Sequence, residues 1–198
     1  MNYRNAAIGL FVLCVCVVPA NANSAGLLGN YYDGTTWSGS PILTRVDATI
    51  DWPPWPSPDW PKEDEISVRW EGYLCLNSAD TIRFGLQSDD GSSLLINGIE
   101  RTSADYYSSY YVGAIQWSLP IALSAGCHPL TLEYFEAGGN QGIQLYWEPA
   151  GQTPEIIPSS ALSTTGGSGG VIPEPATMLG VVLALTGIAT YVRKRRIA

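Results

Sequence analysis

Apolar and polar side chains alternate along much of the middle of the chain. In the stretch 67–76, Val68, Trp70, Leu74 and Leu76 share one face, while Arg69, Glu71, Tyr73 and Cys75 share the other. The same period of two recurs in three later runs, Ile82/Phe84/Leu86, Leu130/Leu132/Tyr134 and Ile143/Leu145/Trp147. This period is typical of strands with one buried face. Without a convincing amphipathic helix, such short strands predict an all-β fold, an antiparallel sandwich or barrel.

Turn-forming residues separate the predicted strands. Residues 26–32 predict the first strand, and Asn97-Gly98 predicts a two-residue hairpin, because a type I′ turn needs positive φ at both central positions. The stretch 51–61 is rich in proline, which has no backbone N–H, so we expect a polyproline-like loop outside any sheet. Packing against the body is favoured over stacking on a sugar for its three tryptophans, Trp52, Trp55 and Trp60.

The first residues have the pattern of an export signal. Arg4 precedes an apolar run over residues 6–18, and Ala20-Asn21-Ala22 supplies a small-x-small cleavage site. Residues 1–22 therefore predict a secretory signal peptide, which takes no part in the fold.

The composition changes again after the predicted domain, which covers residues 23–162. Residues 163–170 are rich in Ser, Thr and Gly and predict a flexible linker. Residues 176–192 are apolar, and as a helix they span about 25 Å, slightly less than the ~30 Å hydrocarbon core of a membrane. The basic residues that follow, 193–196, are expected to stay on the cytoplasmic side, so this predicted transmembrane helix leaves the domain outside.

Two of the four cysteines, Cys14 and Cys16, belong to the signal peptide. Cys75 and Cys127 remain, an even pair in an exported protein, for which we expect a disulfide. Both have the opposite phase to the apolar residues of their strands, so the thiols face away from the core and can bridge neighbouring strands. Closing a loop of about 50 residues would stabilise the fold by roughly 4 kcal/mol.

The chain is acidic, with a formal net charge of −8. Between residues 23 and 170, five basic side chains stand against seventeen acidic ones. Such a domain repels phosphates and has no basic patch, so nucleic-acid binding is excluded.

No catalytic site is predicted. His128 is the only histidine and lies at a strand start, where a structural role is expected, so neither a zinc triad nor a Ser-His-Asp set is indicated. Glu133 and Glu136 fall on opposite faces of a strand, which argues against a paired acid–base site. We therefore expect that the protein is not an enzyme.

Asp89 and Asp90 occupy a turn directly after an apolar strand. At about 5 Å, their carboxylates would repel each other by about 3 kcal/mol at an effective dielectric constant near 20. Water, backbone N–H groups or a cation must offset this repulsion, and Ca²⁺ collects carboxylates and carbonyls from irregular loops. The alternative is that Asp and Gly simply form a favourable turn here.

The tail combines Pro173-Glu174-Pro175, the apolar segment and a terminal Arg/Lys cluster, in that order. Together they resemble a PEP-CTERM sorting signal. The resemblance implies an exported protein of the Gram-negative type whose tail is recognised, and cut near Pro-Glu-Pro, by an exosortase-type membrane enzyme. Such proteins accompany exopolysaccharide production, and a plain single-span membrane anchor is the alternative.

A second resemblance covers roughly residues 25–160. It is carried by Gly26–Tyr32, Ser67–Leu74, Phe84–Ser92, Ala125–Leu130, Glu133–Glu136, Leu145–Pro149 and Ile157–Ser159. These stretches are similar to the PA-fourteen domain, a β-sandwich module named after protective antigen and found in adhesins and glycosidases. The resemblance implies an antiparallel β-sandwich.

In sugar-binding members of that family, two consecutive aspartates joined by a cis peptide bind Ca²⁺ together with a second loop, and the ion holds sugar hydroxyls. Asp89 and Asp90 match the pair, and the second loop corresponds to residues 136–140. Glu136 stands where the adhesins carry an asparagine ligand, which favours Ca²⁺ by charge. Backbone carbonyls near Gly138 and Asn140 would complete the shell.

The carbohydrate site implied by the resemblance comprises Asp89, Asp90 and Asn140. Tyr106 and Tyr107, from a tyrosine-rich stretch over residues 103–113, either add a recognition surface beside it or pack within their own loop.

Taken together, these features predict an exported, surface-associated carbohydrate-binding or adhesion module that depends on Ca²⁺. Its expected partners are an extracellular polysaccharide or glycan, an exosortase-type enzyme, and a membrane through the C-terminal helix. The alternative is a non-catalytic matrix or protein-interaction domain with a purely structural calcium site.

Overall fold

The computed structural model describes residues 24–53, 60–104 and 114–166, which form thirteen strands and one short 3-10 helix. The strands are β1 Leu27–Asp33, β2 Leu43–Asp47, β3 Asp51–Trp52, β4 Ile66–Leu76, β5 Asp80–Asp89, β6 Gly91–Ile96, β7 Ile99–Ala104, β8 Gln116–Trp117, β9 Ile121–Leu123, β10 Gly126–Glu136, β11 Gly142–Pro149, β12 Glu155–Ile156 and β13 Leu162–Ser163, and the helix η1 is Ser159–Ala161.

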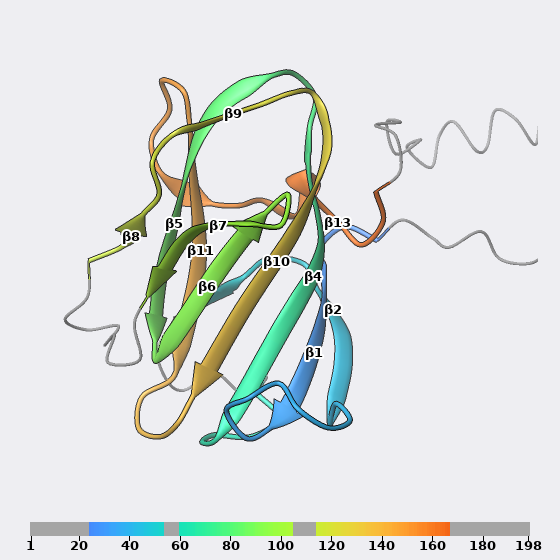
Figure 1. Ribbon diagram of the computed structural model, residues 1–198, viewed down its shortest axis with the longest axis vertical. Helices are drawn as coiled ribbons and strands as arrows, with labels where there is room; N and C mark the ends of the chain where they lie inside the picture. The colour runs from blue at the N-terminus through green and yellow to red at the C-terminus, as the bar shows by residue number, and fades with distance from the viewer. Residues whose placement is uncertain (1–23, 54–59, 105–113, 167–198) are drawn as a thin grey trace, which may run out of the picture.

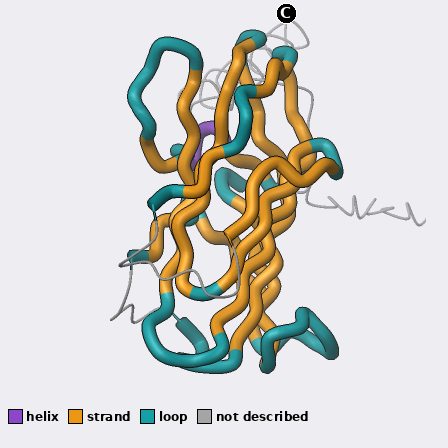
Figure 2. Tube along the Cα trace, turned by 60° about the vertical axis from the view of Figure 1, so that its left-hand side comes forward, coloured by secondary structure: helices purple, strands orange, loops and turns teal. Residues whose placement is uncertain are grey.

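The strands form two antiparallel sheets (Figure 1). One sheet has the order β2-β1-β4-β10-β6-β7, with β13 also paired to β4. The other has the order β12-β11-β5-β8, with β3 on β11 and β9 on β5. Figure 2 shows long strands running between two ends at which many of the loops gather. The prediction of an all-β antiparallel sandwich is confirmed.

The core lies between the two sheets, on the faces that the alternation predicts. Eleven of the predicted apolar positions are at most 1% exposed: Val68, Trp70, Leu74, Ile82, Phe84, Leu86, Leu130, Leu132, Tyr134, Ile143 and Leu145. Leu76 and Trp147 are partly buried against the same cluster. Full burial of a large aliphatic or aromatic side chain contributes about 1.5–3 kcal/mol, so these alternating runs are the main source of stability.

The predicted hairpin joins β6 and β7. Asn97 and Gly98 have φ angles of 56° and 71°, both positive as a type I′ turn requires. This short connection fixes the register of the two strands, which pair at Ile96 and Ile99.

The tryptophan-rich stretch packs on the core, as predicted for two of its three tryptophans. Trp60 lies 4.4 Å from Trp52 and 5.4 Å from Tyr134, measured between ring centroids. The expectation that residues 51–61 stay out of any sheet is wrong at one end, because Asp51 and Trp52 form β3 and pair with β11. These two residues precede the first proline and keep their N–H groups. Trp55 lies outside the described residues.

The domain continues past its predicted boundary at residue 162. Ser163 pairs with Tyr73 of β4, and the backbone N–H of Thr164 donates to the carbonyl of Ser24 at 3.0 Å. The predicted linker over residues 163–170 therefore begins with residues that are hydrogen-bonded to the domain.

Three predicted segments lie outside the described residues: the signal peptide 1–22, the sorting motif Pro173-Glu174-Pro175 and the apolar helix 176–192. Within the described ranges, no helix has the length and apolar character needed to cross a membrane.

Cys75 and Cys127 lie directly opposite each other on β4 and β10 and form a disulfide, with their Cα atoms 4.0 Å apart. The side chains point away from the core, as the strand phase predicts. The bridge links the two longest paired strands near one end of the sheet.

Replacing both cysteines by serine should lower the free energy of unfolding by about 2–4 kcal/mol, because the unfolded chain regains the entropy of the open loop. Urea denaturation of the wild type and the double variant measures this difference. Mass spectrometry after alkylation should find neither Cys75 nor Cys127 modified in the exported wild type, and two alkylated cysteines would contradict the bridge.

Candidate metal centre

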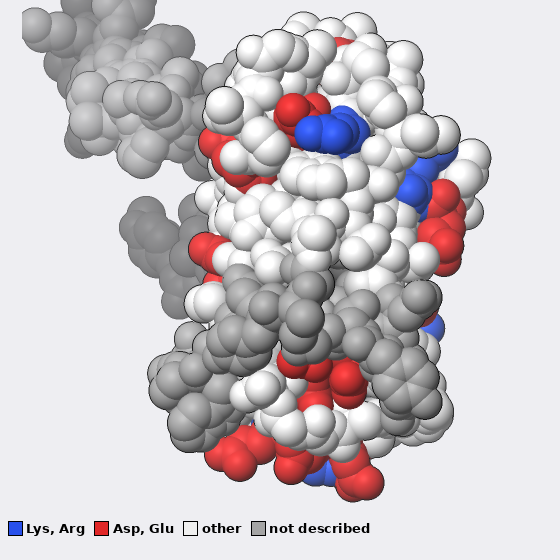
Figure 3. All heavy atoms as spheres, turned by 90° about the vertical axis from the view of Figure 1, so that its left-hand side faces the viewer, with Lys and Arg blue, Asp and Glu red and all other residues white. Residues whose placement is uncertain are grey.

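Three carboxylates meet where β5 and β10 end. Asp89 is the last residue of β5, Asp90 follows it through a cis peptide bond, and Glu136 is the last residue of β10. One carboxylate oxygen from each residue lies within 4.8 Å of the others. Acidic side chains gather toward the lower end of the face in Figure 3, the same end at which Figure 1 shows β10 finishing.

The turn from β5 into β6 brings the aspartates toward β10. Gly91 pairs with Phe135 of β10, and a Cβ atom at Gly91 would lie only 2.4 Å from the Phe135 ring. A glycine is therefore required for this close approach. Because Phe135 directly precedes Glu136, the same contact places the aspartate turn beside the glutamate.

Hydrogen bonds hold the aspartate turn in place. The Tyr134 hydroxyl donates to the backbone carbonyl of Asp89 at 2.6 Å, and the Ser88 hydroxyl donates to the carbonyl of Asp90 at 2.8 Å. The backbone N–H of Ala137 donates to Oδ2 of Asp90 at 3.0 Å. One N–H group thus offsets part of the repulsion between the carboxylates.

Glu136 is fully buried and only half satisfied. Its relative exposure is 0%, and its Oε1 accepts a hydrogen bond from the backbone N–H of Gly138 at 2.6 Å. Its Oε2 is buried without a hydrogen-bond partner. A buried carboxylate in this state is costly unless it takes up a proton or pairs with a cation.

The buried carboxylate of Asp47 shows what a satisfied one looks like in the same fold. Its Oδ2 accepts hydrogen bonds from Tyr31 at 2.6 Å and from Trp70 at 2.7 Å, and its Oδ1 accepts from Arg45 at 2.7 Å. Among the described residues, no basic side chain pairs with Glu136, so its environment differs from that of a structural ion pair.

Burial, together with the negative charges of Asp90, Asp89 and Asp64, raises the pKa of Glu136 to about 8, although the hydrogen bond from the Gly138 N–H opposes this shift. Near neutral pH the metal-free cluster therefore holds a proton that a cation would displace.

The structure places the other predicted site residues as follows. Gly138 and Asn140 are exposed in the loop between β10 and β11, directly after Glu136. Tyr106 and Tyr107 lie outside the described residues.

The residues judged structural lie away from the cluster. His128 lies near the other end of β10, where its Nε2 is 2.9 Å from the Ser124 carbonyl. Glu133 faces the opposite side of the strand from Glu136 and pairs with Arg69 at 2.7 Å. This separation of the two glutamates agrees with the predicted strand phase.

Two functional neighbours were not predicted. Asp64 accepts a hydrogen bond from the N–H of Gly139 at 3.2 Å and so fixes the loop after β10. Tyr134 was predicted only as a core position, although its hydroxyl supports Asp89. Tyr134 and Glu136 are two residues apart on one strand, so their side chains point to the same face. This spacing is the one feature of the sequence that could have indicated that Tyr134 points toward the cluster.

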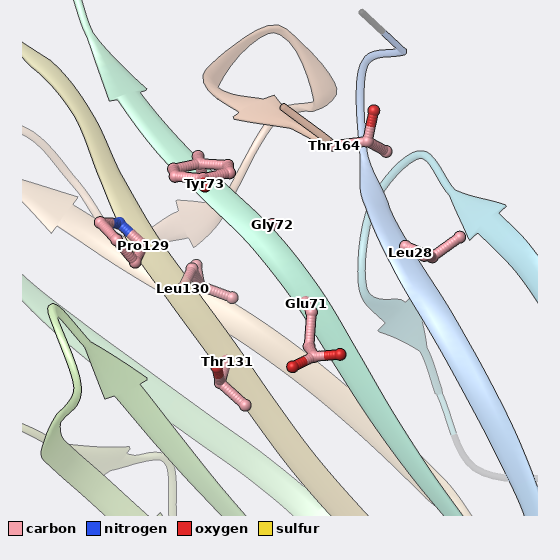
Figure 4. A pocket seen from close by; sticks show the side chains of 8 residues that line it. All are labelled: Leu28, Glu71, Gly72, Tyr73, Pro129, Leu130, Thr131 and Thr164. Carbon is pink, nitrogen blue, oxygen red and sulfur yellow. The ribbon is translucent and has the colours of Figure 1, made fainter. Parts of the chain in front are cut away.

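A shallow groove of about 280 Å³ lies elsewhere, on the sheet that contains β1, β4 and β10 (Figure 4). Its lining residues are Leu28, Glu71, Gly72, Tyr73, Pro129, Leu130, Thr131 and Thr164. Glu71 is the single carboxylate in this lining, so the groove has no cluster comparable to that of Asp89, Asp90 and Glu136.

Comparison with known proteins identifies relatives of the domain. A family model described as PA14 domain matches residues 23–108. The anti-sigma-I factor RsgI3 of Acetivibrio thermocellus is 31% identical, and the match covers 74% of this chain and 22% of that protein. The solved structure of an anti-sigma factor domain-containing protein from Clostridium clariflavum is 28% identical, with a TM-score of 0.61 over 74% of this chain and 49% of that chain.

A PA14 sugar-binding domain from an RTX adhesin has a similar structure. It has a TM-score of 0.55 at 17% identity, over 72% of this chain and 99% of that chain. This likeness shows a shared fold. The chain spans about a fifth of the curated relative and about half of the solved clostridial protein.

The raised pKa of Glu136 predicts how pH affects the metal-free protein. Between pH 4.5 and about 8, the unfolded chain loses this proton while the folded protein keeps it, so stability falls as pH rises, by up to about 1.4 kcal/mol per pH unit. Glu136→Gln keeps an oxygen for the Gly138 N–H but cannot titrate. Urea denaturation with chelator at pH 5 to 8 should show the variant gaining stability relative to the wild type as pH rises. If the stability of both proteins changed with pH in the same way, the raised pKa of Glu136 would be contradicted.

Proposed function

We propose, from the match of a PA14 domain model to residues 23–108, that the protein is an exported carbohydrate-binding or adhesion module whose acidic cluster holds Ca²⁺. The observation that carries the proposal is the convergence of Asp89, Asp90 and Glu136, one of whose oxygens is buried without a partner. We propose further that the target is an extracellular polysaccharide and that the protein is not an enzyme.

The donor chemistry of the cluster fits calcium. Ca²⁺ takes six to eight oxygen ligands from carboxylates and carbonyls in flexible geometry, and all three side chains offer oxygen. Zinc prefers nitrogen and sulfur ligands, and neither histidine nor cysteine belongs to the cluster. Asp89, Asp90 and Glu136 would hold the ion, and the carbonyls of Gly138 and Asn140 would add ligands from the exposed loop.

A sugar would approach from the loop side of the cluster. Glu136 and Asp89 are buried, whereas Asp90 is half-buried and Gly138, Gly139 and Asn140 are exposed. Calcium held between them would present its free positions toward the loop, where sugar hydroxyls can coordinate. The RTX adhesin domain with the same fold is a sugar-binding domain, which supports this use of the site.

The second candidate function is a matrix or protein-interaction domain in which calcium is purely structural. The burial of Asp89 and Glu136, at 8% and 0% exposure, favours it, because a buried ion has few positions left for a sugar. Anti-sigma activity is not part of either proposal, because this chain matches only 22% of the anti-sigma relative.

Export and sorting are also proposed. The predicted signal peptide and the tail that resembles a PEP-CTERM signal support secretion, followed by cutting or anchoring at a membrane with the domain on the outer side. An exosortase-type enzyme is the proposed processing partner.

A glycan array separates the two candidate functions. The purified protein should bind a subset of glycans in millimolar Ca²⁺ and lose that binding in chelator. If calcium raises the melting temperature but no glycan is bound, the structural candidate is correct and the carbohydrate proposal fails.

Asp89→Ala tests the position of the ion. Calcium at a hundredfold excess over its Kd should stabilise the wild type by about 2.7 kcal/mol, whereas the variant loses a carboxylate ligand and should gain almost nothing. Glu136→Gln should reduce the gain without abolishing it, because an amide oxygen still coordinates. Glu71→Ala, which removes a carboxylate in the distant groove, is the matched control, and a full calcium response in Asp89→Ala would place the ion elsewhere.

A further inference from the structure

A second unsatisfied oxygen is buried on Gln141, the residue before the strand partner of Asp89. Four buried side-chain polar atoms of the described residues have no hydrogen-bond partner, and two of them are oxygens: Oε2 of Glu136 and Oε1 of Gln141. Gln141 is only 2% exposed. A buried amide oxygen without a donor costs about 1–3 kcal/mol. A bound cation would remove this cost by coordinating the oxygen.

The backbone of Gln141 is held against the aspartate turn. The next residue, Gly142, pairs with Asp89 across β11 and β5. From β10, the Tyr134 hydroxyl donates to the carbonyl of the same Asp89 at 2.6 Å. Gln141 therefore lies one residue from a contact that already joins β5, β10 and β11.

The strand phase directs the Gln141 side chain between the sheets. Gln141 shares the phase of Ile143 and Leu145, which are buried in the core. On the facing sheet, Glu136 shares the phase of Leu132 and Tyr134, which are also buried. Stacked sheets lie about 10 Å apart, so side chains that enter the interior from opposite sheets are able to meet. Residues 137–141 connect β10 to β11 at this end, which brings the backbones of Glu136 and Gln141 close together.

We propose that the amide oxygen of Gln141 is a further ligand of the cation held by Asp89, Asp90 and Glu136, an inference that rests on the calcium site proposed above. Three carboxylates already exceed the charge of a divalent ion. A neutral amide completes the oxygen shell without adding to their repulsion. The same ion satisfies both of the buried oxygens that the fold leaves unpaired.

Gln141→Met tests this, because methionine keeps most of the volume and removes the oxygen. If Gln141 is a ligand, the metal-free variant should be slightly more stable than the wild type, by about 2–4 °C in melting temperature. The Kd of the variant for Ca²⁺ should rise about 10- to 100-fold. A residue that only fills space would instead lower the stability of the metal-free protein and leave the Kd unchanged. Gln144 lies in β11, which begins directly after Gln141, and has the opposite phase to Gln141, so Gln144→Met is the matched control and should leave the Kd unchanged.

Terbium(III) gives a readout that packing alone does not move. Luminescence decay of the Tb³⁺-loaded full chain in H₂O and D₂O counts the waters on the ion, and Gln141→Met should gain one relative to the wild type. Gln141→Asn keeps an amide but shortens its reach, so it should also gain a water and provides the test if the methionine variant does not fold. If the water count and the Kd are unchanged in either variant, Gln141 is not a ligand, but the calcium site itself still stands. If the wild type binds neither Ca²⁺ nor Tb³⁺, the calcium site is also wrong.

Discussion

The pairing of β4 with β10 is the contact on which the rest of the structure depends. All eleven residues of each strand are in register, from Leu76 opposite Gly126 to Ile66 opposite Glu136. On its other side, β4 carries β1 and β13, and β10 carries β6, so the whole sheet is built outward from this pair. A slip of one residue would turn the inner face outward and would move Glu136 out of the core.

The strands could be predicted from the sequence because their signal is local. The period of two identifies which side chains of β4, β5, β10 and β11 are buried, and the phase of Cys75 and Cys127 shows that they face outward together. The short elements carry no such signal. Asp51–Trp52 and Leu162–Ser163 pair with strands far along the chain. The proline-rich and serine-rich sequences around them instead predict a loop and a linker.

The residues of the candidate site likewise fall into those that could be predicted from the sequence and those that could not. Asp89, Asp90 and Glu136 could be singled out because an aspartate pair at a turn and the family resemblance point to them. Tyr134, Asp64 and Gln141 could not, since their roles depend on how two sheets face each other and on which loop reaches which strand end. A glutamine before a strand looks like any other polar residue until its burial is known.

The two ends of β10 are closed in different ways. Cys127 is bonded covalently to β4 near one end, and Glu136 joins the acidic cluster at the other, roughly 30 Å away along an extended strand. A disulfide persists in oxidising surroundings, and extracellular calcium modules work at about 10⁻⁴–10⁻³ M Ca²⁺. If the chain is exported and binds calcium as proposed, both closures would form only in an oxidising, calcium-rich exterior, so the domain would be flexible at both ends before export and become rigid afterwards.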